Sequence, residues 1–95
     1  MKILIADDSE VVRREVSLIL SAEPGWHVCG EACNGDDAIE IVRGLNPDLV
    51  LVDMRMPGKN GLEVAALTRQ EFHHVAVIIM SQYDPSTLLP RVGRP

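Results

Sequence analysis

The sequence predicts an α/β domain built around a parallel β-sheet. Short apolar runs, typical of strands buried on both faces, recur along the chain. Amphipathic segments of roughly a dozen residues, a typical helix length, separate these runs. Strands that alternate with helices form βαβ units with right-handed crossovers, so the strands are expected to run parallel. With 95 residues, the chain has room for one domain with one hydrophobic core.

The first strand is expected at Lys2 to Ala6, an apolar run that leads into the acidic pair Asp7 and Asp8. An amphipathic helix from about Ser9 to Ala22 follows, and Asp8 or Ser9 would cap its first turn. The apolar stripe of this helix consists of Val12, Val16, Ile19 and Leu20. This segment therefore supplies the first crossover of the predicted sheet.

A second strand is expected at Trp26 to Ala32, and its mixed polarity favours an edge position in the sheet. Asn34 and Gly35 then form the turn into a second helix, which ends near Asn46 and Pro47. The apolar stripe of this helix consists of Ala38, Ile41, Val42 and Leu45. Two acidic residues in its first turn favour the helix dipole.

The third strand, Leu49 to Asp53, organises the rest of the chain because its last residue is a single carboxylate after an apolar run. A third helix is expected from about Gly61 to Gln70, with a less regular stripe. That stripe consists of Leu62, Ala65, Ala66 and Phe72. A fourth strand at Val75 to Met80 would deliver Ser81 to the same edge of the sheet. Residues 85–95 contain three prolines and predict a short helical turn and an irregular tail.

Composition excludes several classes of function. The net charge of −5 argues against direct nucleic-acid binding. No apolar run approaches the roughly 20 residues of a membrane span, and the apolar start is too short for a secretory signal, so a cytoplasmic location is expected. Cys29 and Cys33 lack the spacing of a metal or redox pair and are expected to be free thiols. A zinc site would need distant histidines as further ligands, and we set it aside.

Three carboxylates are expected to converge at one edge of the sheet: Asp7, Asp8 and Asp53. Ligands bind outside the carboxyl ends of the strands in open α/β sheets, and these residues follow two such ends. Because like charges repel at short range, a shared proton or a hard divalent cation would stabilise them. Mg²⁺ suits a site with few carboxylates and an incoming phosphoryl group, and a carboxylate beside it can attack phosphorus. Ser81 would then donate to a phosphoryl oxygen.

At these residues the chain resembles the receiver domain of bacterial two-component response regulators. The resemblance rests on an acidic pair after the first strand, a single aspartate after the third, and a hydroxyl residue after the fourth. Two short motifs, Met56-Pro57 and Asn60-Gly61, complete it. It spans about Lys2 to Asp84 and implies a flavodoxin-like, doubly wound parallel sheet of about four strands in the order 2-1-3-4, with three helices. Residues 1–84 would form the receiver domain.

The resemblance also implies a role for each site residue. Asp53 would accept a phosphoryl group from a phosphohistidine of a sensor histidine kinase. Asp8 would bind Mg²⁺ directly, Asp7 through water, and the backbone carbonyl of Arg55 would be a further ligand. Ser81 would be the hydroxyl that moves toward the phosphoryl group. Two short segments are most similar to the subfamily with a C-terminal helix-turn-helix DNA-binding domain, which implies a role in transcription regulation.

The chain departs from the family pattern after its fourth strand. The family's fifth strand, with its lysine and aromatic residue, and its last helix have no counterpart, and the only lysines are Lys2 and Lys59. The fourth strand is then expected to be an open edge, and the apolar face of the first helix to be partly bare. Both features predict a homodimer or a swapped oligomer.

Three classes of function are considered. The first is a phosphoacceptor signalling domain, which is not an enzyme. The second is an interaction or dimerisation module that keeps the fold but no longer accepts phosphate. The third is an aspartyl-phosphate phosphatase, which we discount because such enzymes carry a second aspartate where this chain has Arg55.

Overall fold

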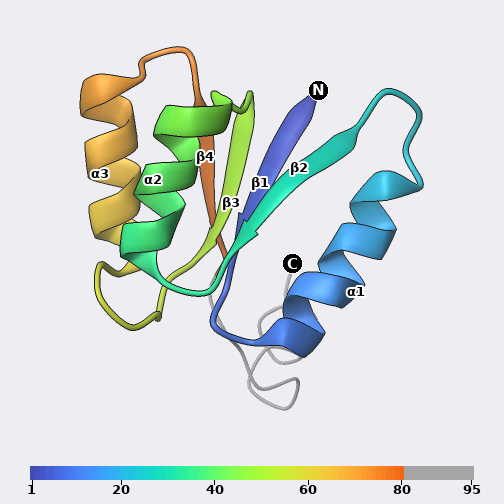
Figure 1. Ribbon diagram of the computed structural model, residues 1–95, viewed down its shortest axis with the longest axis horizontal. Coiled ribbons are helices and arrows are strands. Elements are labelled where there is room, and N and C mark those ends of the chain that lie inside the picture. The colour runs from blue at the N-terminus through green and yellow to red at the C-terminus, as the bar shows by residue number, and fades with distance from the viewer. Residues whose placement is uncertain (81–95) are drawn as a thin grey trace, which may run out of the picture.

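The computed structural model describes residues 1–80, and strands and helices alternate throughout this range (Figure 1). The elements in chain order are β1 (Lys2–Ala6), α1 (Glu10–Ser21), β2 (His27–Ala32), α2 (Gly35–Leu45), β3 (Leu49–Asp53), α3 (Gly61–Glu71) and β4 (Ala76–Met80). The four strands and three helices predicted for this range are confirmed, and most of their ends lie within one residue of the predicted positions. Ser81 and the predicted turn at 85–95 lie outside the described residues.

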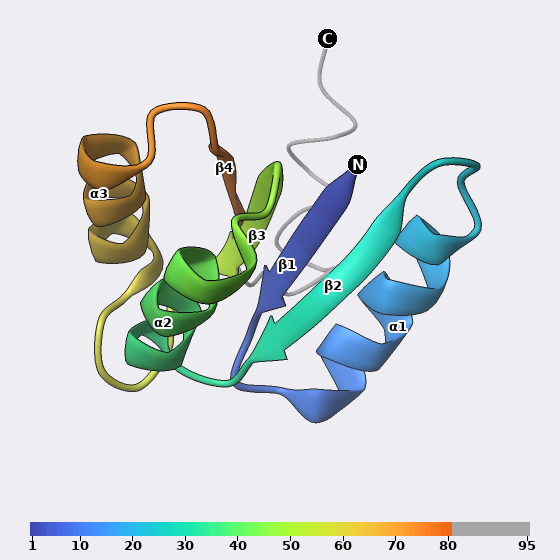
Figure 2. The same ribbon diagram turned by 45° about the horizontal axis from the view of Figure 1, so that its top comes forward.

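The four strands form one parallel sheet in the order β2-β1-β3-β4. The predicted order 2-1-3-4 and the edge position of β2 are therefore confirmed. β1 lies between β2 and β3, so that Ala6 faces Ala32 on one side and Val52 on the other. The strands end at a common edge, where the loops after β1, β2 and β3 lead into the helices (Figure 2).

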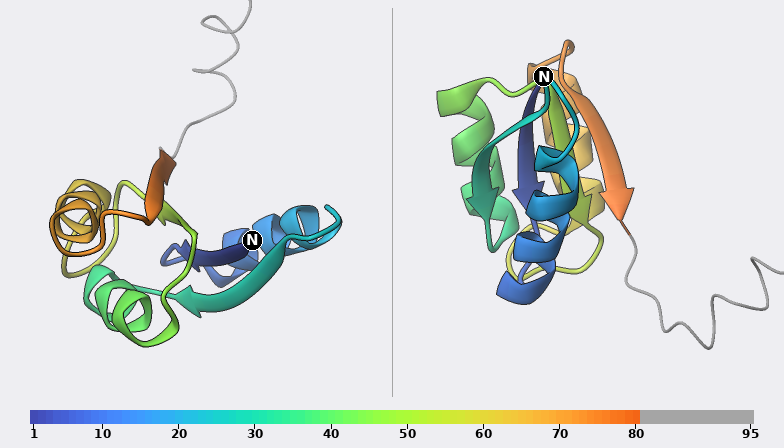
Figure 3. Two further views of the ribbon diagram at one scale, coloured as in Figure 1. Left: turned by 90° about the horizontal axis from the view of Figure 1, so that it is seen from above. Right: turned by 90° about the vertical axis from the view of Figure 1, so that its right-hand side faces the viewer.

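The helices cover the two faces of the sheet unequally. α2 and α3 lie side by side on one face, and α1 lies on the other, next to β1 and β2 (Figure 3). The larger core, beneath α2 and α3, consists of Leu4, Ala6, Ala32, Ala38, Ile39, Val42, Val50, Val52, Val64 and Val75. The smaller core beneath α1 consists of Ile3, Ile5 and Leu51, with half-buried neighbours. Alternate residues of β1 therefore enter opposite cores, as expected for a strand buried on both faces.

Each helix begins with a side-chain cap at the carboxyl edge of the sheet. The caps are Ser9, Asn34 and Asn60, and each accepts a hydrogen bond from a backbone N–H in the first turn of its helix. Asn60 and Glu63 form a reciprocal pair, because the Asn60 N–H also donates a hydrogen bond to the carboxylate of Glu63 at 3.2 Å. These caps fix where each helix starts and therefore fix the short loops that carry the acidic residues.

Two of the predicted helix faces need correction. In α3, Leu62 is 56% exposed and Ala66 is exposed, whereas Val64, Ala65 and Thr68 are buried. In α2, the prediction of Ala38 and Val42 is confirmed and Ile41 is half-buried. Leu45, however, is exposed at the last turn, and Ile39 is buried in its place. The reason is that α2 packs against both the sheet and α3, which shifts its buried face around the helix axis.

α1 is the least covered helix. None of its residues is buried, and Val11, Leu18 and Ile19 are 67%, 70% and 69% exposed. The predicted partial exposure of its apolar face is confirmed for Ile19, while Val16 and Leu20 pack on the smaller core. Among residues 1–80, no helix has the length and hydropathy required to cross a membrane.

Candidate functional site

The carboxyl edge of the sheet brings Asp7, Asp8 and Asp53 together, as predicted. One carboxylate oxygen from each residue lies within 4.8 Å of the others. Asp53 is the last residue of β3, and Asp7 follows the end of the adjacent strand β1, so the parallel pairing places them side by side. We call this cluster the acidic site.

The two inner carboxylates of the acidic site are removed from solvent. Asp53 is 1% exposed and Asp7 is 3% exposed, whereas Asp8 is exposed. The Oδ2 atom of Asp53 is buried and has no hydrogen-bond partner among the described residues. A buried carboxylate oxygen without a partner costs free energy unless a cation or a proton compensates for it. This atom therefore marks the point where a ligand would be stabilised most.

Burial also changes the acidity of both inner residues. It raises the pKa of Asp53 above the ordinary value of 3.8, and the charge of Asp7 raises this pKa further, while the nearby backbone N–H groups of Arg55 and Met54 oppose the rise. Burial likewise raises the pKa of Asp7; a hydrogen bond from the Ser9 N–H lowers it, and the charge of Asp8 raises it again. Both carboxylates thus hold protons more tightly than an exposed aspartate, and a divalent cation would relieve the same repulsion.

Backbone hydrogen bonds fix the position of Asp7. Its N–H donates to the carbonyl of Ala32 at 3.0 Å, and its Oδ1 accepts from the N–H of Ser9 at 2.8 Å. Its own carbonyl accepts a hydrogen bond from Nη1 of Arg13 at 2.6 Å. Arg13 was not among the residues predicted for the site. No spacing rule distinguishes it from Arg14, because only the fold shows which arginine turns inward.

The loop after β3 is held close to Asp53. The N–H of Met54 donates to the carbonyl of Met80 at 2.8 Å, and the N–H of Gly61 donates to the carbonyl of Met54 at 2.9 Å. A Cβ atom at Gly61 would lie 2.6 Å from the carbonyl oxygen of Asp53, so only glycine fits here without a shift. Arg55, the predicted carbonyl ligand, is an exposed residue in this loop, two positions after Asp53.

The same loop is anchored to the start of α2. Nζ of Lys59 lies 2.6 Å from Oδ1 of Asp36, and the N–H of Gly35 donates to the carbonyl of Pro57 at 3.3 Å. A Cβ atom at Gly35 would lie 1.9 Å from the carbonyl oxygen of Lys59, and Gly58 has a φ of +75°. The loop that follows Asp53 is therefore fixed at its middle as well as at its two ends.

The donor set of the acidic site fits Mg²⁺. Hard divalent cations prefer carboxylate and carbonyl oxygens, and Mg²⁺ is commonly held by one or two carboxylates together with water and substrate phosphate. The site offers two buried carboxylates, of which that of Asp53 has an unpartnered oxygen, and one exposed carboxylate. Ser81, the predicted hydroxyl donor, lies outside the described residues, so its role stays a prediction.

Fold and site together define a class of proteins: doubly wound α/β domains with an acidic site at the carboxyl ends of the central strands. Comparison with known families shows which family within this class the chain matches. The sequence model of the response regulator receiver domain matches residues 3–92. The chain belongs to the response regulator receiver domain family.

Individual relatives agree with this assignment. The chain is 44% identical over 81 residues to protein-glutamate methylesterase/protein-glutamine glutaminase 4 of Geobacter metallireducens. The matched segment is 85% of this chain and 23% of the relative. The chain is also 39% identical over 79 residues to the nitrate/nitrite response regulator protein NarL of Escherichia coli K12. The matched segment is 83% of this chain and 37% of that relative.

A solved structure gives the same result for the fold. The signal receiver domain of a NarL response regulator from Mycobacterium tuberculosis superposes with a TM-score of 0.79 at 32% identity, covering 95% of this chain and 73% of that one. The chain spans well under half the length of the two curated relatives. The likeness to the methylesterase thus concerns its receiver domain, and no esterase activity is assigned to this chain.

Proposed function

We propose that Asp53 accepts a phosphoryl group from a phosphohistidine of a sensor histidine kinase. The observation that carries this proposal is the buried, unpartnered Oδ2 of Asp53, in a cluster where one carboxylate oxygen each of Asp53, Asp7 and Asp8 lie within 4.8 Å of one another. Membership of the receiver domain family supports the same reading. An acceptor carboxylate needs an oxygen that is free to attack phosphorus, and Oδ2 of Asp53 has no hydrogen-bond partner among the described residues.

In this proposal, Asp7, Asp8 and Asp53 hold Mg²⁺ together with the backbone carbonyl of Arg55. When bound, the cation would neutralise phosphoryl oxygens and the charge of the carboxylates. An oxygen of Asp53 attacks phosphorus, the P–N bond of the phosphohistidine breaks, and its electron pair stays on the imidazole nitrogen. Ser81 donates its hydroxyl hydrogen to a phosphoryl oxygen of the product.

The proposed output of this signalling domain is regulation of transcription. Response regulators such as NarL of Escherichia coli are similar to this chain, although the chain covers only 37% of that relative. The net charge of −5 disfavours contact between this segment and DNA, so another part of the regulator would bind it. A cytoplasmic location and the absence of enzymatic activity are part of the same proposal.

We further propose that the 95-residue chain self-associates through β4 and the exposed apolar face of α1. Within residues 1–80, β4 is paired with β3 along one side only, and Ile78 on β4 is 52% exposed. Light scattering at increasing concentration should show dimers or larger species. Ile78→Lys should reduce them, whereas Leu62→Lys, at an exposed leucine of α3, should not. A monomer at high concentration would rule this proposal out.

The phosphoacceptor role is tested by intact mass after incubation with Mg²⁺ and a small phosphoryl donor. The wild-type chain should gain one phosphoryl group, and Asp53→Asn should gain none. Asp48→Asn is a matched control, because Asp48 lies just before the other end of β3 and is exposed. A folded wild-type chain that binds Mg²⁺ but gains no phosphoryl group would instead support the interaction module that no longer accepts phosphate.

A further inference from the structure

We propose that Arg13 is a positioning residue for the acidic site and acts through the backbone of Asp7. This inference rests on the proposed Mg²⁺ site. It concerns a residue on α1 that contributes no ligand atom to that site. Arg13 differs from the other charged residues of α1 because its side chain is only 15% exposed.

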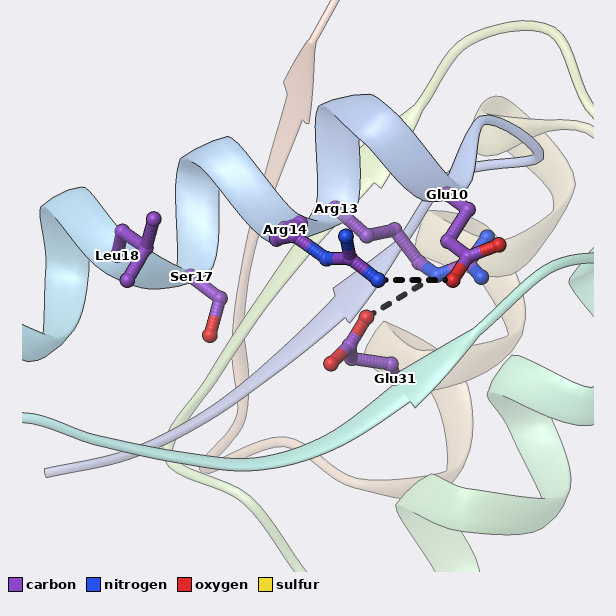
Figure 4. A pocket seen from close by; sticks show the side chains of 6 residues that line it. All are labelled: Glu10, Arg13, Arg14, Ser17, Leu18 and Glu31. Carbon is purple, nitrogen blue, oxygen red and sulfur yellow. Dashed lines mark hydrogen bonds and ion pairs between the residues drawn. The ribbon is translucent and has the colours of Figure 1, made fainter.

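The guanidinium of Arg13 joins three elements of the fold. Nη1 donates to the carbonyl oxygen of Asp7 at 2.6 Å, and Nε lies 3.1 Å from Oε1 of Glu31, near the end of β2. Figure 4 shows the Arg13 side chain reaching from α1 toward Glu31 on β2, in a hollow that both elements line. A planar guanidinium can hold these two acceptors at once because its donors have a fixed geometry.

The carbonyl that Arg13 holds belongs to the peptide bond between Asp7 and Asp8. The N–H of Asp7 is already bonded to Ala32, so β2 fixes one side of this residue and Arg13 fixes the other. The bond from Arg13 therefore sets the orientation of the peptide plane that leads into Asp8. Groups that orient metal ligands affect affinity even though they do not touch the metal.

Arg14 provides a matched comparison on the same helix. Its Nη2 lies 3.1 Å from Oε1 of Glu10, and both side chains are 73% exposed (Figure 4). Such an exposed pair contributes little to stability. Arg14 lines the same hollow as Arg13, and its ion pair with Glu10 stays within α1. Replacing it changes the charge of the helix by the same amount without touching Asp7.

Charge and positioning predict opposite effects on Mg²⁺ binding. The positive charge of Arg13 would by itself oppose a divalent cation nearby, so its loss should tighten binding if charge were its only effect. The loss of the hydrogen bond to Asp7 should weaken binding if Arg13 positions the site. Arg13→Lys separates the two, because lysine keeps the charge but its single ammonium cannot reproduce the fork that reaches both acceptors.

The test is the Mg²⁺ dissociation constant of the 95-residue chain, measured by isothermal titration calorimetry. Arg13→Lys and Arg13→Gln should both weaken binding about 10- to 100-fold, the usual cost of losing a group that orients a ligand. Arg14→Gln should bind as the wild type does. Glu31→Ala should weaken binding, and Glu31→Gln should recover part of the loss, because its amide oxygen can still accept from Arg13.

Thermal unfolding without Mg²⁺, recorded for each variant, separates a lost site from a lost fold. Cooperative unfolding of Arg13→Lys together with weaker Mg²⁺ binding supports the inference. Wild-type affinity in Arg13→Lys, or tighter binding in Arg13→Gln, overturns it. If the wild-type chain itself fails to bind Mg²⁺, the proposed metal site fails first, and the positioning role fails with it.

Discussion

Replacing Asp53 with asparagine should stabilise the chain at pH 7 in the absence of Mg²⁺. The variant keeps the size of the side chain but removes the most deeply buried charge of the acidic site. For two unit charges 4.8 Å apart, Coulomb's law gives about 3.5 kcal/mol at an effective dielectric constant of about 20, and about 0.9 kcal/mol in bulk water. Because Asp53 and Asp7 are buried while Asp8 is exposed, we expect a gain of about 1 to 3 kcal/mol.

This gain should depend on pH in a defined direction. The pKa of Asp53 is raised by burial and by Asp7, so the folded chain binds a proton above the ordinary pKa of 3.8, where the unfolded chain has released it. The contribution of this carboxyl group to the free energy of unfolding is therefore highest below pH 3.8. It is lost as the pH rises through the raised pKa of the folded chain. The advantage of Asp53→Asn should be complete above that pKa and should disappear near pH 3.8.

Thermal unfolding followed by circular dichroism measures both effects. A gain of 1 kcal/mol should raise Tm by roughly 4 to 8 °C in a domain of this size. Mg²⁺ at about 1,000 times its Kd should reverse the order, because it then adds about 4.1 kcal/mol to the wild type and little to the variant. A Tm of Asp53→Asn equal to or below that of the wild type at pH 7 without Mg²⁺ would refute the reasoning.

Three further predictions concern α3 and its N-terminal cap. Thr68→Val should leave the free energy of unfolding unchanged or raise it by up to about 1 kcal/mol, because the buried Oγ1 of Thr68 has no hydrogen-bond partner among the described residues. Gly61→Ala should lower it by about 1 to 3 kcal/mol, because the new Cβ would lie 2.6 Å from the carbonyl oxygen of Asp53. Asn60→Ala should lower it by about 1 kcal/mol through loss of the cap of α3. Urea unfolding measures all three.

Each of these predictions has a control or a result that contradicts it. Gly44→Ala, in α2, is the control for Gly61→Ala, because nothing lies within 4 Å of its new Cβ. It should raise the free energy of unfolding by about 0.5 to 1 kcal/mol. A loss above about 1 kcal/mol in Thr68→Val would mean that its hydroxyl has a partner. Asn60→Asp should retain most of the stability that Asn60→Ala loses, since aspartate also caps helices.

The sequence was sufficient to predict the acidic site because strand ends are simple to locate. Asp53 closes an apolar run and Asp7 follows another, and parallel pairing leaves these two ends at one edge. The convergence of the carboxylates follows from topology alone. Their difference in burial does not, because Asp7 and Asp8 are neighbours in the chain and only the packing of β1 between two strands determines which one turns inward.

Helix faces were harder to predict where apolarity was weak. In α3, Leu62 and Ala66 are apolar but exposed, while the hydroxyl residue Thr68 is fully buried. A stripe of alanines carries little information about direction, because burying a methyl group contributes little free energy, roughly 0.8 kcal/mol. Tertiary packing against α2 and β4 therefore decided which side of α3 faces the core.

The anchoring of the loop after β3 has a consequence for changes in chain length. Loops usually tolerate insertions, since lengthening them costs little entropy. Here Gly35 leaves no space beside the Lys59 carbonyl, and Lys59 holds Asp36, so one added residue between Asp53 and Asn60 would displace both contacts. The turn around Gly25 offers the opposite case, because residues 21–27 are all exposed. A fluorescent label or peptide tag should be accommodated at that turn and rejected by the loop.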